Sequence, residues 1–117
     1  MKRYIKATSK LDMHSKFRLQ QAVEEYIESE FGLHINEFRW NRKSRCDIFQ
    51  FSILGDYRNN ADVINASYPE LKTYDDRKRK MMNDIKIALL DNPEFDEWDV
   101  DARFFRYHVP TITMTHI

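Results

Sequence analysis

Glycine, proline and cysteine are scarce in this sequence of 117 residues, which contains two glycines, three prolines and one cysteine. A phosphate-binding loop needs clustered glycines that let the backbone approach phosphate, and Gly32 and Gly55 are too far apart for one. Cys46 stands alone, which excludes an internal disulfide, a C-x-x-C redox pair and a zinc knuckle built on cysteines. The scarcity of these residues therefore excludes several common enzyme and cofactor classes.

Long hydrophobic runs are also missing. No apolar stretch approaches the roughly 20 residues that span a bilayer, and none follows the basic start of the chain, so we expect no secretory signal. The length suits one domain with its own core, since domains cluster at about 100–150 residues. The sequence therefore predicts one cytoplasmic domain over residues 1–117, without a membrane partner.

Two segments have the three- and four-residue spacing of apolar side chains that is typical of amphipathic helices. The first covers residues 14–31, after capping oxygens on Ser9 and Asp12, and Gly32 supplies a left-handed C-terminal cap. The second begins between Pro69 and Thr73 and ends at Asp91-Asn92-Pro93. Residues 55–68 between these helices have the composition of a loop, with Asn59-Asn60 at its centre.

Alternating apolar and polar residues predict strands elsewhere. Residues 2–8 form an expected opening strand, and residues 35–54 form a hairpin that turns at the polar run 41–44. The last strand alternates from Phe105 to Thr115, and its apolar parity changes at Pro110. We expect a bulge or bend at this proline and a position at the sheet edge, because proline cannot donate to a central ladder.

The predicted order is β-α-β-β-α-β, which is the ferredoxin-like arrangement of an α+β domain with two helices on one face of an antiparallel sheet. In this arrangement the threonines of the last strand would line an open edge. A homodimer through Thr111, Thr113 and Thr115 is then possible, since unpaired strand edges invite addition.

Charge of either sign is abundant but sums to zero, with 19 Lys and Arg against 19 Asp and Glu. The zero hides segregated blocks, which create local potentials on the surface. The basic residues of interest lie around the hairpin turn and at the head of the second helix: Arg39, Arg42, Lys43, Arg45, Arg77, Lys78, Arg79 and Lys80. The acidic residues lie before the last strand: Glu94, Asp96, Glu97, Asp99 and Asp101.

Our first hypothesis is a small non-enzymatic interaction protein that acts by stoichiometric binding to a protein partner. The acidic segment would mimic a phosphate track for a basic groove, and Trp98 would supply an aromatic anchor if it is exposed. The basic residues form a second patch. An alternative is a module that binds single-stranded RNA or DNA through these basic residues, with stacking on nearby rings such as Phe38 and Trp40.

Catalytic patterns are weak, so we expect no enzyme, no catalytic residues and no cofactor. The four histidines lack metal-ligand spacing, the lone Cys46 is expected to be a small buried hydrophobe, and G-x-S-x-G is absent. A metal-dependent nuclease at the acidic segment is a further alternative, since hard cations prefer carboxylate oxygens. The twelve-residue calcium loop and its glycine are absent, so a solvated acidic loop is the preferred interpretation and no metal site is assigned.

The first eight residues, Met-Lys-Arg-Tyr-Ile-Lys-Ala-Thr, resemble the start of many small uncharacterised proteins encoded by bacterial phages and mobile elements. The resemblance assigns no site and no mechanism. It implies a compact accessory protein, of the kind that includes inhibitors of host defence machinery. Such inhibitors typically occupy a surface of a nucleic-acid-binding protein.

Overall fold

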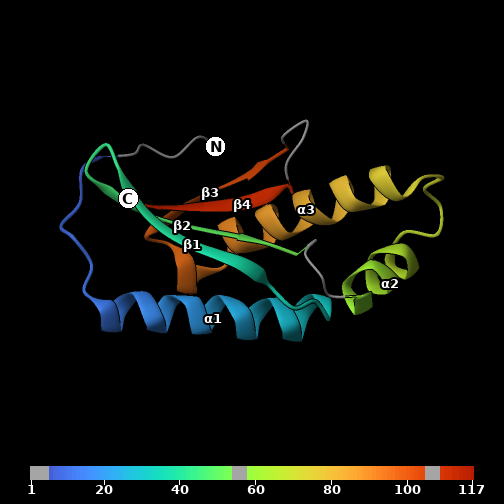
Figure 1. Ribbon diagram of the computed structural model, residues 1–117, viewed down its shortest axis with the longest axis horizontal. Coiled ribbons are helices and arrows are strands. Elements are labelled where there is room, and N and C mark those ends of the chain that lie inside the picture. Colours follow the sequence, from blue (N-terminus) through green and yellow to red (C-terminus); the bar gives the residue numbers. More distant parts are fainter. Residues whose placement is uncertain (1–5, 54–57, 105–108) are drawn as a thin grey trace.

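The computed structural model describes residues 6–53, 58–104 and 109–117 (Figure 1). Its elements, in chain order, are α1 (Met13–Phe31), β1 (Asn36–Lys43), β2 (Cys46–Ser52), α2 (Arg58–Ser67), α3 (Tyr74–Asp91), the short 3₁₀ helix η1 (Pro93–Phe95), β3 (Trp98–Arg103) and β4 (Thr111–His116). The four strands form one antiparallel sheet in the order β1-β2-β4-β3. The chain is an α+β domain, as the sequence predicts.

The core lies between one face of the sheet and the helices. Alternate residues of β2 and β4 point into it, including Phe49, Phe51 and Ile112, and all three are completely buried. Buried side chains of α1 and α3, such as Ile27 and Ile85, join the same cluster. Both long helices therefore cover the same face of the sheet. Among the described residues, no helix is long and apolar enough to cross a membrane.

The ferredoxin-like order is wrong. The observed order is α-β-β-α-α-β-β. Residues 6–8 of the expected opening strand belong to no regular element, and residues 2–5 lie outside the described residues. The acidic stretch that we expected before the last strand instead contains a strand of its own, β3, because Trp98 and Val100 point into the core and alternate with aspartates. The tail is a hairpin rather than a single strand.

The predicted edge position of the last strand is also wrong. β4 lies between β2 and β3: Thr113 and Thr115 pair with residues of both strands, and Thr111 pairs with Arg103 of β3. Pro110 precedes the first residue of β4, so its missing N–H removes no donor from the ladder. A homodimer through this strand has no free edge to use. The expected alternation at residues 105–108 lies outside the described residues.

The first helix is confirmed, and its caps are the predicted ones. The Asp12 carboxylate accepts a hydrogen bond from the Ser15 N–H at 2.7 Å, and Gly32 closes the helix with a left-handed φ of 69°. The Ser15 main-chain hydrogen bond holds the pKa of Asp12 below its ordinary value, because this bond favours the ionised carboxylate.

The cap gives a pH prediction. A carboxylate whose pKa is depressed by folding stabilises the folded state above its unfolded pKa, at about 4, and this contribution is lost as the pH falls. We expect thermal unfolding, followed by circular dichroism, to shift to lower temperature between about pH 5 and about pH 3. In the Asp12→Asn variant, whose amide caps without titrating, this shift should be smaller. Equal shifts in both proteins would contradict a contribution from the cap.

The hairpin over residues 35–54 is confirmed, but its turn covers residues 43–46, two residues later than the polar run 41–44 suggested. Lys43 pairs with Cys46, and the two turn residues Ser44 and Arg45 have positive φ angles of 53° and 62°. Positive φ at both central residues is what a type I′ turn requires. The backbone therefore adopts the tight turn without the Asn-Gly or Asp-Gly pair that usually marks it.

The loop predicted for residues 55–68 is largely a helix, α2, which begins at Arg58. Asn60 is almost completely buried in it. Its side-chain oxygen accepts the His34 N–H at 2.9 Å, and its amide nitrogen donates to the carbonyls of His34 and Ile53 at 2.7 and 2.8 Å. Asn60 suggested a turn in the sequence, but its hydrogen bonds connect α2 to the residues just before β1 and just after β2.

The second predicted helix is confirmed as α3. Its N-cap is Thr73, whose hydroxyl accepts the Asp76 N–H at 3.1 Å, and it ends at Asp91, two residues before Pro93. The spacing of apolar residues in this segment predicts a buried stripe of Met81, Met82, Ile85, Ala88 and Leu89; four of them are buried and Ala88 is half-buried. The helix thereby fixes where the basic residues of its first turns lie.

Candidate functional site

The β1–β2 hairpin carries three exposed cations. Arg39 lies on β1, Lys43 ends it and Arg45 lies in the turn, and all three side chains are exposed. Within the ranges that the structure describes, none of them belongs to an ion pair. Their charge is therefore available to a partner.

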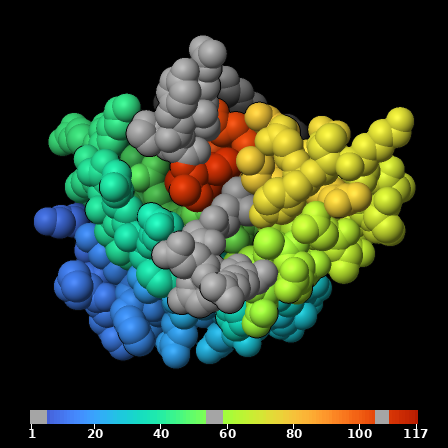
Figure 2. Space-filling view, turned by 45° about the vertical axis from the view of Figure 1, so that its right-hand side comes forward, coloured from blue at the N-terminus to red at the C-terminus, as the bar shows by residue number. Residues whose placement is uncertain are grey.

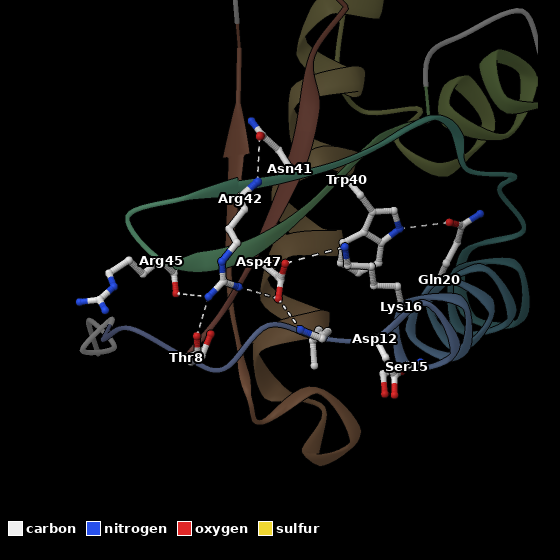
Figure 3. A network of polar contacts seen from close by, with 11 residues as sticks. Thr8, Asp12, Ser15, Lys16, Gln20, Trp40, Asn41, Arg42, Arg45 and Asp47 are labelled. Atoms are coloured by element: carbon white, nitrogen blue, oxygen red, sulfur yellow. Dashed lines mark hydrogen bonds and ion pairs between the residues drawn. The ribbon is translucent and has the colours of Figure 1, made fainter.

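Arg42, the fourth predicted basic residue of the hairpin, is held by Asp47 (Figure 3). Arg42 Nη1 donates to Asp47 Oδ2 at 2.9 Å, and the same oxygen accepts the Leu11 N–H at 2.8 Å. Lys16 Nζ lies 3.9 Å from the other carboxylate oxygen. The carboxylate is completely buried, so this cluster serves to join the hairpin to the segment before α1.

Further contacts fasten the same segment to the turn. The Thr8 N–H donates to the Arg45 carbonyl at 3.1 Å, and Arg42 Nη2 donates to the carbonyls of Thr8 and Arg45. The Cys46 thiol donates to the Lys6 carbonyl at 3.0 Å. Cys46 is buried, as expected. We therefore assign structural roles to Arg42 and Cys46, and leave Arg39, Lys43 and Arg45 as the functional candidates of this turn.

Large apolar side chains are exposed beside the hairpin. Phe38 of β1 is 43% exposed although its ring stacks on Phe49. Next to it, the half-buried Trp40 lies against α1: Lys16 Nζ is 5.5 Å from its ring centre and its Nε1 donates to Gln20 (Figure 3).

Two residues of α1 extend this apolar surface. Met13 and Phe17 precede Lys16 and Gln20 by three residues each, which places them on the adjoining flank of the helix. They are 79% and 62% exposed. We call the set Arg39, Lys43, Arg45, Phe38, Trp40, Met13 and Phe17 the hairpin surface. The sequence interpretation did not include Met13 and Phe17. Both are apolar residues that lie off the buried stripe of their helix, and this departure from the stripe could have identified them as exposed.

The predicted basic residues of α3 do not join this surface. In Figure 1 the hairpin turn and the start of α3 lie at opposite ends of the long axis, and Figure 2 shows β1 and α3 on opposite sides of the molecule. Their charges are also engaged locally. Lys78 and Arg79 both contact Asp75, Lys80 contacts Asp84, and Arg77 donates to main-chain carbonyls. The two cations beside Asp75 hold the pKa of that carboxyl below its ordinary value.

The acidic segment is divided among several environments. Glu94, Asp96 and Glu97 are exposed around η1, whereas Asp99 is half-buried on β3. Asp101 is paired with Lys86 at 3.5 Å and approaches Arg103 at 3.8 Å. The segment therefore presents a smaller acidic surface than the sequence suggests.

Trp98 is not available as an anchor. It is only 6% exposed, and its ring packs edge-on against Trp40, at a centroid distance of 6.1 Å, and against the His116 ring at 4.9 Å. His116 Nε2 in turn lies 3.5 Å from a carboxylate oxygen of Glu97. The tryptophan belongs to the core, and the condition for its proposed role is not met.

No metal-holding group is found within residues 6–53, 58–104 and 109–117: no three or more His, Cys, Asp or Glu side chains are arranged to hold an ion there. The acidic residues near η1 and β3 therefore do not converge on a shared cation site in this part of the chain. His108 lies outside the described residues.

Comparisons with protein-family models, with curated proteins and with solved structures found no match.

Proposed function

We propose that this protein is a non-enzymatic interaction protein that binds a protein partner, one to one, through the hairpin surface. The observation that carries the proposal is that exposed cations, Arg39, Lys43 and Arg45, and exposed apolar side chains flank one edge strand, β1, and its turn, with Arg39 and Lys43 on one face of the strand and the aromatic rings on the other. Interfaces commonly combine apolar anchors with a charged rim, in which the anchors supply affinity and the rim sets association rate and specificity.

The cations make an acidic partner the best match. The original hypothesis used the acidic segment for a basic partner, but burial of Trp98 removes its anchor and pairing of Asp101 reduces its charge. The hairpin surface has both an exposed apolar anchor and exposed charges. Inhibition of a host defence or nucleic-acid-binding protein by a phage or mobile element remains the biological setting that we propose, and only the resemblance of the first eight residues supports it.

Two charge-reversal variants test which surface binds. One replaces Arg39, Lys43 and Arg45 with Glu, and the other replaces Asp96, Glu97 and Asp99 with Lys. Proteins captured from the producing cell or its host would be identified, purified and titrated calorimetrically with each variant. We expect the basic-set variant to weaken binding at least tenfold, or by about 1.4 kcal/mol, while the acidic-set variant retains it. Retained binding by the basic-set variant would contradict the proposal.

A second candidate is binding to single-stranded nucleic acid. It is favoured by the exposed Phe38 ring beside Arg39, since bases stack on aromatic faces while cations contact phosphate. Affinity for an oligonucleotide should then fall steeply between low and moderate salt. Absence of any measurable shift of a labelled oligonucleotide at low salt would eliminate this candidate.

A further inference from the structure

β1 forms one edge of the sheet. It pairs with β2 on its inner side, and among the described strands none pairs with its outer side. Its side chains from Glu37 to Lys43 are exposed except for the half-buried Trp40. An exposed strand edge presents main-chain groups to which an extended peptide can add.

The turn determines which main-chain groups face outward. In a two-residue hairpin the residues that flank the turn, here Lys43 and Cys46, exchange hydrogen bonds, and bonded pairs then alternate with non-bonded pairs. The main-chain groups of Arg42 and Trp40 therefore point away from β2. The Arg42 N–H is already used, because it donates to the Asn41 side-chain oxygen at 2.8 Å. The accessible part of the edge is centred on Trp40.

The two faces of β1 differ in chemistry. Cross-strand partners share a face, so Trp40 lies with its partner Phe49 on the core side. Arg39, Asn41 and Lys43 pair with Gln50, Ile48 and Cys46, so they lie on the opposite face. Phe38 stacks on Phe49 and thus lies on the core side, next to the exposed flank of α1. Arg42 pairs with Asp47 and so shares the aromatic face, but its guanidinium is held by the Asp47 carboxylate, so the cations of β1 outside the ion pairs of the described residues, Arg39 and Lys43, lie on the other face.

The difference between the two faces of β1 indicates which kind of strand could pair with its outer edge. An added strand has side chains that alternate between the two faces, so apolar residues would adjoin Phe38 and Trp40 while acidic residues adjoin Arg39 and Lys43. A second copy of this chain is a poor match, because antiparallel pairing of β1 with itself about Trp40 would place Arg39 of each copy opposite Asn41 and diagonal to Arg39 and Lys43 of the other copy. Like charges across strands are destabilising.

We propose that the outer edge of β1 binds an extended segment of a partner protein in which acidic and apolar residues alternate, as a fifth strand of the sheet. This inference rests on the proposed function, since it specifies how a partner would occupy the hairpin surface. Main-chain hydrogen bonds at Trp40 would set the register, and the Phe17 flank of α1 would border the apolar side chains of the added strand.

A synthetic peptide of about eight residues, with Glu alternating with Val, tests the inference directly. The controls are the Lys–Val peptide and the Glu–Val peptide with N-methyl groups on alternate residues, which remove the main-chain donors along one edge. Binding would be followed by amide shifts in nuclear magnetic resonance spectra and by tryptophan fluorescence. The protein variants are Arg39→Glu with Lys43→Glu, and as a matched control Lys72→Glu, an exposed cation just before α3.

We expect the Glu–Val peptide to shift amides of β1 and to bind at least tenfold more tightly than either control peptide. The double variant should lose this binding, whereas Lys72→Glu should keep it. Equal affinity of the N-methylated and the unmodified Glu–Val peptide would overturn the strand mode, as would amide shifts confined to other elements. If a protein partner depends on Arg39, Lys43 and Arg45 but the peptide does not bind, the strand mode fails and the proposed function stands.

Discussion

Replacing Asp47 with alanine is expected to lower the free energy of unfolding by about 3 kcal/mol, because it removes a buried acceptor that several donors share. The Leu11 N–H and the Arg42 guanidinium lose their carboxylate partner, and Lys16 loses its nearby countercharge. The segment that precedes α1 would lose its main attachment to the hairpin. Chemical denaturation followed by tryptophan fluorescence measures this change.

The Arg42→Ala variant completes a double-mutant cycle. Alone it leaves a completely buried carboxylate with Lys16 at 3.9 Å as the nearest cation, so it should also destabilise the fold. The double variant should lose less than the sum of the two single changes, because both remove the same interaction. A loss below about 1 kcal/mol for Asp47→Ala, or additive effects, would contradict the role assigned to this cluster.

Asn60→Ala is expected to cost a similar amount, about 3 kcal/mol, since three hydrogen bonds are lost at about 1 kcal/mol each. The substitution leaves the His34 N–H and the carbonyls of His34 and Ile53 without this partner in the interior. Thermal and chemical unfolding measure the effect. Asn59→Ala is the matched control, because Asn59 is the exposed neighbour in the same helix and its loss should change stability by less than about 0.5 kcal/mol. Equal effects of the two substitutions would show that Asn60 has no special role.

Asn60 also explains why one helix escaped prediction. Asparagine favours turns because its side chain competes locally for main-chain groups. In α2 that side chain satisfies main-chain groups of His34 and Ile53, which lie 26 and 7 residues away in sequence, outside the helix. Long-range pairing of this kind leaves no periodic signal, whereas α1 and α3 carry both caps and stripes and could be predicted from residues near one another.

The order of the strands in the sheet could not be predicted from the sequence for a related reason. Alternation identifies a strand but not its neighbours, and Pro110 suggested an edge because the register around it was unknown. Of the candidate site, Arg39, Lys43 and Arg45 were named from the sequence as a basic patch, and the structure shows all three exposed; their role in binding stays a prediction. Sequence spacing could not distinguish them from Arg42, whose carboxylate partner is five residues away across the hairpin.

The central position of β4 has a consequence for how the chain is made. β1, β2 and β3 leave the ribosome before residues 111–116, yet β2 and β3 meet only through β4. Until β4 enters, the nascent chain has a hairpin open on both sides and a separate β3 with no partner strand, and such edges favour aggregation. The sheet is therefore completed in one late step, so we expect interrupted synthesis to leave a product that depends on chaperones rather than a smaller folded domain.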